Sequence, residues 1–320
     1  MKKMKILVTG GAGFIASNFV RRLLEASDDE ITILDCLTYA GDRRTLADLM
    51  ENSRVSFVQG DVCDRETVSR VVKGHKEIVH FAAESHVDRS IQNPDQFVLT
   101  NCLGTNVMCD VARTHDIERF VHVSTDETYG SIEAGSFGEL DLLNPSSPYA
   151  ASKAASDLIA LSYRTTFDLP VIVTRSSNNY GPFQHPEKLI PLFITNLLDG
   201  LSVPLYGTGQ NIRDWIYVED NCNAIETVLR SGNVGEIYNI GADNEVTNLN
   251  ITNRLIELCE AKSDAVIFVE DRLGHDLRYS VDCSKVRSLG WTPRMSLREG
   301  LAETVNWYRE NQAWWRGKKS

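Results

Sequence analysis

Short apolar segments alternate with amphipathic stretches along the first half of the chain. The apolar segments are nearly continuous runs of Ile, Val, Leu and Phe, which is typical of strands buried on both faces. The predicted strands are Lys5–Thr9, Ile31–Asp35, Val55–Gln59, Glu77–Ala82, Phe120–Thr125 and Val171–Arg175. The predicted helices between them are Phe14–Ala26, Arg65–Val72, Pro94–Thr114 and Tyr149–Phe167. This alternation predicts an α/β fold built on a doubly wound parallel sheet.

The regular alternation ends after Ser176, where the loops Asn178–Pro186 and Gly207–Arg213 combine Gly, Pro, Asn and Arg. Loops beyond the carboxyl ends of parallel strands are where such folds bind ligands. We therefore expect a smaller C-terminal substrate-binding lobe beside the sheet. The expected division assigns residues 1–175 and about 213–240 to the sheet domain, and about 176–212 and 241–320 to the lobe.

The chain ends in WYRENQAWWRGKK, which we predict to be a surface helix with a frayed tail whose basic end is solvated. The formal net charge of -11 argues against a nucleic-acid partner. No segment has the apolar length to span a membrane. The seven cysteines are odd in number and contain no C-x-x-C pair, which favours reduced thiols in a cytoplasm over disulfides or a zinc site.

A glycine-rich turn joins the first predicted strand to the first helix in ILVTGGAGFIASNFV. Gly10 allows a tight turn, Gly13 allows a pyrophosphate to approach the backbone, and the small Ala16 lets the helix meet the strand. Asp35 ends the next strand, where a carboxylate would hold a ribose 2′-OH and repel a 2′-phosphate. The pattern predicts a Rossmann dinucleotide site that prefers NAD to NADP, although Arg43 and Arg44 just downstream weaken that preference.

Candidate chemistry lies farther along the chain. Tyr149 and Lys153 are four residues apart on a predicted helix, so both side chains share one face. The lysine charge is expected to lower a tyrosine pKa that starts near ~10, giving a base for a sugar or alcohol hydroxyl. Asp126 and Glu127 follow a strand and offer a second proton-transfer function. They can reach one ligand only if the chain turns there; the alternative is a polar loop at the sheet edge.

Together with PYAASKAASD, these residues closely resemble the extended short-chain dehydrogenase/reductase family, and within it the nucleotide-sugar 4,6-dehydratases, above all those acting on dTDP-glucose. The resemblance runs nearly end to end through TGGAGFIASN, DCLTYAGD, HFAAESHVDRSI, STDETYGS, SPYAASKAASD, RSSNNYGPFQHPEKLIP, LYGTGQNIRDWIYVED, YNIG and DRLGHDLRYS. The Thr-Asp-Glu signature separates the dehydratases from epimerases and decarboxylases with the same Tyr-x-x-x-Lys. Ala16, where Gly is usual, and Thr128, where Val is common, are the two departures, and neither removes a reacting group.

The resemblance implies an NAD-dependent hydro-lyase that converts dTDP-glucose to dTDP-4-keto-6-deoxyglucose with internal hydride transfer. It implies that Tyr149, assisted by Lys153 and Thr125, removes the 4-OH proton. It assigns the C5 proton to Glu127 and protonation of the departing C6 hydroxyl to Asp126. NAD is reduced and reoxidised within one cycle, so it need not leave between turnovers.

The resemblance also implies the binding residues. Around NAD it places Gly10, Gly13, Phe14, Ile15, Asp35, Thr38, Asp61, Val62, Phe81, Ala82, Ala83, Ser85, Asn101, Ser124, Tyr149, Lys153 and Asn178. Around the nucleotide sugar it places Ser85, His86, Asp88, Thr125, Asn178, Glu187, Lys188, Leu189, Pro204, Tyr206, Arg213, Asn248, Arg272, His275 and Tyr279. Asp61-Val62 alone fits an adenine contact and a plain strand-end turn equally well. For His86 and His275 hydrogen bonding is favoured over metal binding, and no metal is expected.

Several alternatives remain open at this point. The substrate could be UDP-glucose, UDP-GlcNAc or another nucleotide sugar. The enzyme could be an NAD-dependent 4-epimerase, or the chain a non-catalytic NAD-binding regulator, although the joint presence of Tyr149, Lys153, Asp126 and Glu127 argues against the regulator. The family expectation is a homodimer built from the predicted helices Pro94–Thr114 and Tyr149–Phe167.

Overall fold

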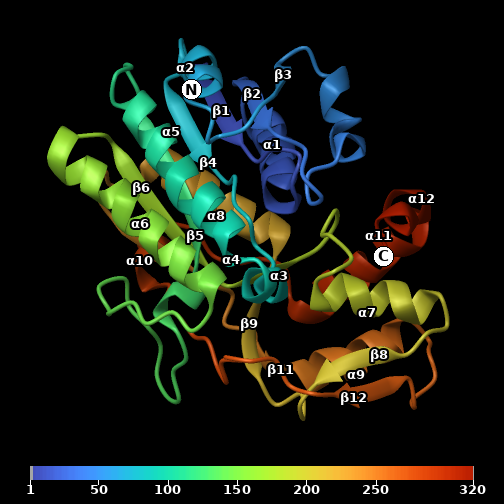
Figure 1. Cartoon of the computed structure of the whole chain (residues 1–320). Helices are drawn as coiled ribbons and strands as arrows, with labels where there is room; N and C mark the ends of the chain where they lie inside the picture. The colour runs from blue at the N-terminus through green and yellow to red at the C-terminus, as the bar shows by residue number, and fades with distance from the viewer. Residues whose placement is uncertain (1–2, 320) are drawn as a thin grey trace.

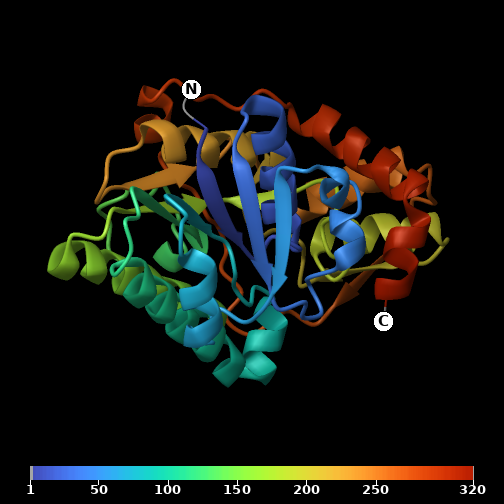
Figure 2. The same ribbon diagram turned by 90° about the horizontal axis from the view of Figure 1, so that it is seen from above.

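A seven-stranded parallel sheet forms the centre of the computed structural model, which describes residues 3–319 (Figures 1 and 2). The strand order is β10-β6-β5-β4-β1-β2-β3. The strands are β1 (Lys5–Thr9), β2 (Glu30–Asp35), β3 (Val55–Gln59), β4 (Glu77–His80), β5 (Arg119–Thr125), β6 (Val171–Ser176) and β10 (Ile237–Ile240). The doubly wound parallel sheet predicted from the apolar runs is thereby confirmed.

Helices cover both faces of this sheet. On one face lie α1 (Phe14–Ala26) and α8 (Val218–Ser231), and on the other α2 (Arg65–Val72), α5 (Gly104–Ala112) and α6 (Pro148–Phe167). Along β1, Ile6 and Val8 pack into the core under α1 and α8, whereas Leu7 packs into the core under α2, α5 and α6. Successive strand residues point to opposite faces, so burial on both faces requires the unbroken apolar run.

The predicted helix Pro94–Thr114 is present as one unbroken helical run from Pro94 to Ala112, with a π-helical middle that the sequence did not predict. The run consists of α4 (Pro94–Phe97), the π-helical segment η3 (Val98–Leu103) and α5, and the short helix α3 (Val87–Gln92) precedes it. Gly104 begins α5 where a side chain does not fit, since a Cβ there would lie 2.7 Å from Val62 Cγ2. Widened π turns of this kind are common beside functional sites. The strand predicted for Glu77–Ala82 ends earlier, at His80.

The remaining elements form a second lobe beside the carboxyl ends of the strands, at the lower right of Figure 1. It contains a three-stranded sheet in the order β11-β9-β7, the parallel pair β12-β8, and several helices around a separate hydrophobic core. Its elements are β7 (Asn178–Tyr180), α7 (Leu189–Leu198), β8 (Val203–Tyr206), β9 (Ile212–Tyr217), β11 (Glu245–Thr247), α9 (Asn248–Leu258), β12 (Val266–Val269), α11 (Leu297–Glu310), α12 (Gln312–Trp315) and η5 (Arg316–Lys318). Four short helices complete the chain: η1 (Arg43–Leu46), η2 (Leu49–Glu51), η4 (Asp126–Tyr129) and α10 (Ser284–Ser288).

The prediction of a frayed, solvated C-terminal tail is wrong. Trp315 is fully buried and Trp314 is 9% exposed, and both belong to the core of the second lobe. The Lys318 ammonium lies 2.6 Å from the Asp42 carboxylate, in the loop that follows β2. The buried tryptophans and an ion pair to a distant segment of the same chain therefore fix this charged C-terminal segment. Within residues 3–319, no helix combines the length and apolar character that a membrane crossing requires.

Candidate functional site

Two neighbouring cavities open where the carboxyl ends of the sheet strands meet the second lobe. The sheet-edge cavity, about 1400 Å³, is lined by the loops after β1, β2, β3 and β4, by the end of β5 and by the start of α6. The lobe cavity, about 1060 Å³, is lined mainly by α7, β8, β9 and the segment around Arg272. Gln184, Glu187 and Lys188 line both cavities, so a ligand in one lies next to a ligand in the other.

The glycine-rich turn forms the floor of the sheet-edge cavity. Gly10 has φ +69, and a Cβ there would lie 2.8 Å from the Ala82 backbone. Gly13 is the N-cap of α1, where a Cβ would approach the Gly10 carbonyl oxygen to 3.1 Å. No side chain caps α1 and its first turn has no acidic residue, so its N–H groups are available to an anion. This cradle fits a pyrophosphate.

Asp35 lies at the end of β2 as the sequence predicts, buried at the edge of the same cavity. Its carboxylate accepts hydrogen bonds from the Ala12 N–H at 2.9 Å and the Leu37 N–H at 2.7 Å. Burial raises the pKa of Asp35, and these two donors oppose the rise. The donors fix the carboxylate while leaving it lone pairs for a ribose hydroxyl.

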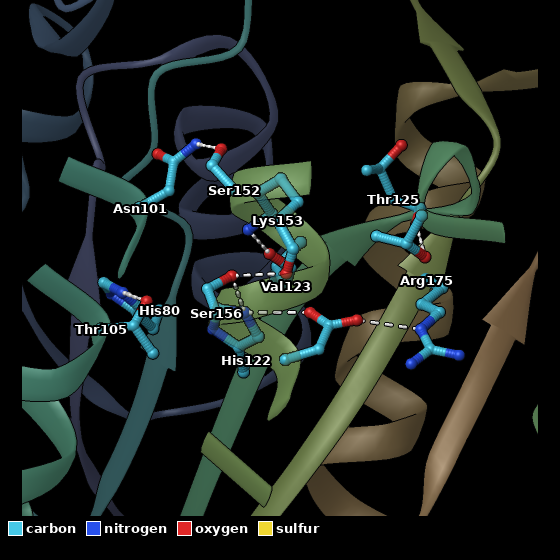
Figure 3. Close-up of polar contacts among 12 residues, drawn as sticks. His80, Asn101, Thr105, His122, Val123, Thr125, Ser152, Lys153, Ser156 and Arg175 are labelled. Carbon is cyan, nitrogen blue, oxygen red and sulfur yellow. Dashed lines mark hydrogen bonds and ion pairs between the residues drawn. The ribbon is translucent and has the colours of Figure 1, made fainter. Parts of the chain in front are cut away.

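Most of the residues predicted for the cofactor meet in this cavity. Those that line it are Gly10, Gly13, Phe14, Ile15, Asp35, Thr38, Asp61, Val62, Phe81, Ala82, Ala83, Ser85, Ser124, Tyr149 and Lys153. Asn178 lines the lobe cavity instead. Asn101 lies behind the wall, where its amide oxygen accepts from the Glu84 N–H at 2.8 Å and its amide nitrogen donates to Ser152 Oγ at 2.8 Å (Figure 3). Asn101 thus fixes the loop after β4.

Helix α6 places Tyr149 and Lys153 at the sheet-edge cavity. Ser147 caps this helix and Pro148 occupies its first turn, so its start is firmly set. The Lys153 ammonium donates to the Val123 carbonyl at 2.7 Å, and Figure 3 shows the side chain directed at that oxygen. Burial lowers the pKa of Lys153 to about 8, and the Asp157 charge opposes this change.

The expected net lowering of the Tyr149 pKa is wrong for this structure, because burial outweighs any effect of the Lys153 charge. Burial raises the pKa of Tyr149, the charge of Glu127 raises it further, and a hydrogen bond with Thr125 opposes the rise. The spacing correctly predicted a shared helix face, but the Lys153 ammonium is bound to Val123. Tyr149 therefore stays protonated until a positive charge enters the cavity or Thr125 and substrate stabilise the phenolate.

The turn needed to bring Asp126 and Glu127 together is present. The helical turn η4 starts directly after β5, and Thr125 Oγ1 caps it by accepting from the Glu127 N–H at 3.3 Å. Thr125 also donates to Asp126 Oδ1 at 3.2 Å. Within residues 3–319, the other oxygen, Asp126 Oδ2, is buried without a hydrogen-bond partner.

The two carboxyl groups have different surroundings. Burial raises the pKa of Asp126 well above its ordinary value, and the charges of Glu127 and Asp214 add to the rise. Burial also raises the pKa of Glu127, but the charges of three cations oppose it: Lys188, Arg213 and Arg272. These surroundings favour a proton on Asp126 over a proton on Glu127.

The lobe cavity gathers cations beside these carboxyl groups. Arg213 is buried, donates to the Asp276 carbonyl at 2.9 Å and lies over the Tyr279 ring at 4.1 Å. Lys188 donates to the Ser85 carbonyl at 2.6 Å. The Arg272 Nε is buried without a partner among the described residues. Two guanidinium groups and an ammonium around one cavity suit a diphosphate.

Most of the residues predicted for the nucleotide sugar line this cavity. They are His86, Asp88, Asn178, Glu187, Lys188, Leu189, Pro204, Tyr206, Arg213, Asn248, Arg272, His275 and Tyr279, together with Glu127. Ser85 lines the sheet-edge cavity, and Thr125 acts through its hydrogen bonds from behind. His86 accepts from the Arg89 N–H at 3.3 Å, and His275 contacts Asp271 at 2.6 Å. No metal-ligating group of three or more His, Cys, Asp or Glu occurs within residues 3–319.

Sequence reasoning missed part of both linings. In the lobe cavity the residues that were not predicted are Val87, Asn179, Gln184, Ile190, Leu192, Phe193, Leu205 and Trp215. In the sheet-edge cavity they include Leu34, Cys36, Ala40, Gly41, Gly60, Glu84, Gln96, Thr100, Val123, Phe183, Gln184, His185 and Trp314. Most are apolar or small residues within strands, helices or turns, where the pattern signals packing only. Trp314 gave one signal, a large aromatic residue in a polar segment.

Comparisons with known proteins agree closely. A family model described as GDP-mannose 4,6 dehydratase matches residues 7–304. A dTDP-glucose 4,6-dehydratase from Streptomyces niveus is 52% identical over 99% of this chain and 96% of its own length. The crystal structure of a dTDP-glucose 4,6-dehydratase from Streptomyces venezuelae, solved with NAD bound, superposes with a TM-score of 0.97 at 52% identity, covering 99% of this chain and 100% of the other. A UDP-glucuronic acid 4-epimerase from Bacillus cereus shares the fold at 26% identity, with a TM-score of 0.91 over 96% of this chain and 99% of the other.

Proposed function

We propose that this chain, which belongs to the dTDP-glucose 4,6-dehydratases of the extended short-chain dehydrogenase/reductase family, removes water from dTDP-glucose to give dTDP-4-keto-6-deoxyglucose. One observation carries the proposal beyond the shared fold. The turn after β5 holds a carboxyl group with a strongly raised pKa next to a carboxylate facing cations, beside Tyr149 and Lys153. An epimerase needs the tyrosine, but only elimination of water needs this acid and base.

NAD is the cofactor, and the sheet-edge cavity has the groups to hold it. The N–H groups at the start of α1 suit its pyrophosphate and Asp35 suits a ribose diol. Ser124 Oγ is buried at this cavity without a protein partner within residues 3–319, which leaves a hydroxyl for a ligand. When bound, NAD+ accepts a hydride from C4 of the sugar and returns it to C6.

The protein groups supply the proton transfers. Tyr149 takes the proton of the 4-OH as C4 is oxidised, assisted by the Lys153 charge and by Thr125. The new 4-keto group acidifies the C5 proton, which Glu127 removes. Asp126 donates its proton to the C6 hydroxyl, which leaves as water. A proton then returns to C5, so one water is lost and no net oxidation occurs.

The three cations of the lobe cavity support a nucleoside diphosphate as the part of the substrate that is bound but does not react. We infer that Arg213 and Arg272 hold the diphosphate and that Pro204 and Tyr206 flank the base. The lining residues alone do not distinguish thymine from uracil. UDP-glucose and UDP-GlcNAc remain the competing substrates.

Incubation with dTDP-glucose in D2O tests the reaction. We expect a 4-keto-6-deoxy sugar with deuterium at C5, identified by mass spectrometry and by its absorbance in alkali. A 4-epimerase would leave C5 protonated and the 6-OH in place, and a non-catalytic regulator would return the substrate unchanged. Parallel assays with UDP-glucose and UDP-GlcNAc would identify the nucleotide, since the true substrate should give the highest kcat/KM.

We further propose a homodimer built from η3, α5 and α6. These elements expose large apolar side chains on one side of the molecule: Val98 at 54%, Leu99 at 49%, Leu103 at 43%, Leu158 at 60% and Phe167 at 49% exposed. A patch of this kind is typical of a protein interface. Leu103→Glu should give a monomer in analytical ultracentrifugation, and an unchanged mass would contradict this surface.

The cellular and domain assignments are also proposals. All seven cysteines are free, which supports a reducing cytoplasm. We propose that residues 1–175 with about 213–240 form the NAD-binding domain, and that about 176–212 with 241–320 form the nucleotide-sugar domain. The separate hydrophobic core of the second lobe supports this division.

A further inference from the structure

The C-terminal segment 312–319, here called the strap, leaves the second lobe and reaches the sheet domain. Its red ribbon lies beside the blue segment after β2 in Figure 2. Three contacts join it to that segment. Trp314 Nε1 donates to Thr45 Oγ1 at 3.2 Å, Arg44 Nη1 donates to the Ala313 carbonyl at 3.3 Å, and Lys318 pairs with Asp42 at 2.6 Å.

Trp314 occupies the inner side of the strap and lines the sheet-edge cavity together with Thr38 and Gly41. Its ring is held in an aromatic group, with ring centres 5.2 Å from Trp307 and 5.8 Å from Phe183. The Lys318 ammonium lies over the Trp314 ring at 4.2 Å. The indole is therefore fixed at the cavity wall by contacts on several sides.

Other residues of the strap are attached to the second lobe. Lys319 donates to the Thr195 carbonyl at 3.1 Å and pairs with Asp199 at 2.8 Å. Arg316 pairs with the same carboxylate at 3.0 Å. Because Arg316 and Lys319 hold the end of α7 while Trp314 and Lys318 hold the loop after β2, the strap joins the two domains beside the cavity.

The Lys318–Asp42 pair is the ion pair among the three contacts that join the strap to the loop after β2. Lys318 and Asp42 expose only 7% and 17% of their side chains. Burial raises the pKa of Asp42, but hydrogen bonds from Arg44 and Lys318 outweigh it and bring the pKa to about 2. At neutral pH this carboxylate is therefore ionised and can pair with Lys318, whose own pKa is lowered by burial while the Asp42 charge opposes that change.

We propose that the strap closes the outer side of the cofactor cavity, that Trp314 contacts the adenosine half of the dinucleotide, and that cofactor release requires the strap to detach. The adenosine half is assigned because Trp314 lies against the loop following Asp35, the carboxylate suited to the ribose. This inference rests on the proposed function for the identity of the cofactor. A cofactor that is reduced and reoxidised within each cycle gains nothing from leaving, so slow release serves the reaction.

Release of NAD from the loaded enzyme tests the proposal without substrate. Enzyme carrying NAD is mixed with an excess of labelled NAD, and the bound label is measured over time after rapid desalting. Trp314→Ala and Lys318→Ala should each exchange NAD about tenfold faster than the unmodified protein, since loss of a closing contact acts chiefly on the dissociation rate. Exchange within twofold of the unmodified protein for both variants would overturn the proposal.

Three further variants separate the strap from a general loss of structure. Trp314→Phe keeps an aromatic ring at the wall and should exchange NAD more slowly than Trp314→Ala. Asp42→Asn combined with Lys318→Ala should be no faster than Lys318→Ala alone if the two act as one link. Arg316→Ala is the matched control. It removes a cation of the strap, but Asp199 remains paired with Lys319, so NAD exchange should equal that of the unmodified protein.

The outcome can be read whatever the substrate is. Failure of turnover on dTDP-glucose would remove the proposed reaction but would leave NAD exchange measurable. Exchange that is equally fast in Arg316→Ala and Lys318→Ala would show that any change in the tail loosens the cofactor, and would refute a specific role for the link to Asp42.

Discussion

Replacing Asp157 by Asn removes a buried negative charge and keeps the shape of the side chain. Asp157 lies on α6 one turn after Lys153 and is fully buried. It accepts from Arg175 Nε at 2.9 Å, and its other oxygen lies 3.3 Å from His122 Nε2. Figure 3 shows His122, Ser156 and Arg175 gathered behind Lys153. The charge of Asp157 raises the pKa of Lys153 against the effect of burial.

The substitution should have two separable effects. Arg175 is 2% exposed, so removing its partner strands a buried cation, which costs about 3–5 kcal/mol. That is a large part of the roughly 5–15 kcal/mol that stabilises a typical protein. Lys153, whose pKa is about 8, should bind its proton at least about tenfold more weakly, a change of about 1.4 kcal/mol. Near neutral pH a larger fraction of Lys153 would then be uncharged.

The assay is the rate at which bound NADH appears after mixing with substrate, measured across pH, together with denaturant unfolding. Lys153 must be charged to favour the Tyr149 phenolate, so the rate falls as pH rises through the Lys153 pKa. In Asp157→Asn this fall should begin at lower pH. Cys102, His80 and His122 also lie near Lys153, and burial favours their neutral forms, so they are not expected to produce this shift. Loss of the Asp157 charge also removes one cause of the raised Tyr149 pKa, which favours the phenolate and acts against an earlier fall.

Glu77→Gln is the matched control. Glu77 accepts from Arg230 at 3.0 Å in another largely buried ion pair, at the amino end of β4 and away from the cavities. It should lower the free energy of unfolding without moving the pH profile. If Asp157→Asn loses stability but keeps the profile of the unmodified protein, Asp157 only holds the fold. Loss of less than 1 kcal/mol would refute the reasoning about Arg175.

Four other predictions concern the reacting groups. Glu127→Gln should allow oxidation at C4 but block removal of the C5 proton, so bound NADH should accumulate after mixing; normal turnover would exclude Glu127 as the base. Tyr149→Phe should prevent oxidation, and any burst of bound NADH absorbance would assign the first proton transfer to another group. Elimination should show a bell-shaped pH dependence: activity is lost as pH falls through the raised pKa of Glu127, which must be ionised, and lost as pH rises through the raised pKa of Asp126, which must be protonated. Asp126→Asn should abolish elimination, and a stopped-flow profile with only one limb in the unmodified protein would contradict the split.

The sheet could be predicted from the sequence because strands buried on both faces must consist of nearly continuous apolar residues, as in Lys5–Thr9. The sequence predicted the glycine turn because only a residue without a Cβ fits at Gly10. It failed for the tail, since the partners that bury Trp314 lie far away in the chain, at Thr45 and Phe183. A local pattern of charge and aromatic residues cannot distinguish a solvated helix from one that crosses between domains.

The carboxyl pair shows where the same limit affects chemistry. Asp126 and Glu127 are adjacent acidic residues that follow the same strand, so nothing in the local sequence makes one an acid and the other a base. The difference arises because η4 turns Asp126 toward Asp214 and turns Glu127 toward Lys188, Arg213 and Arg272. These four partners come from the second lobe and the loop before α7. The lobe that binds the nucleotide therefore also sets which carboxyl group keeps the proton, so substrate diphosphate, by neutralising those cations, should raise the pKa of Glu127 and increase its strength as a base for C5.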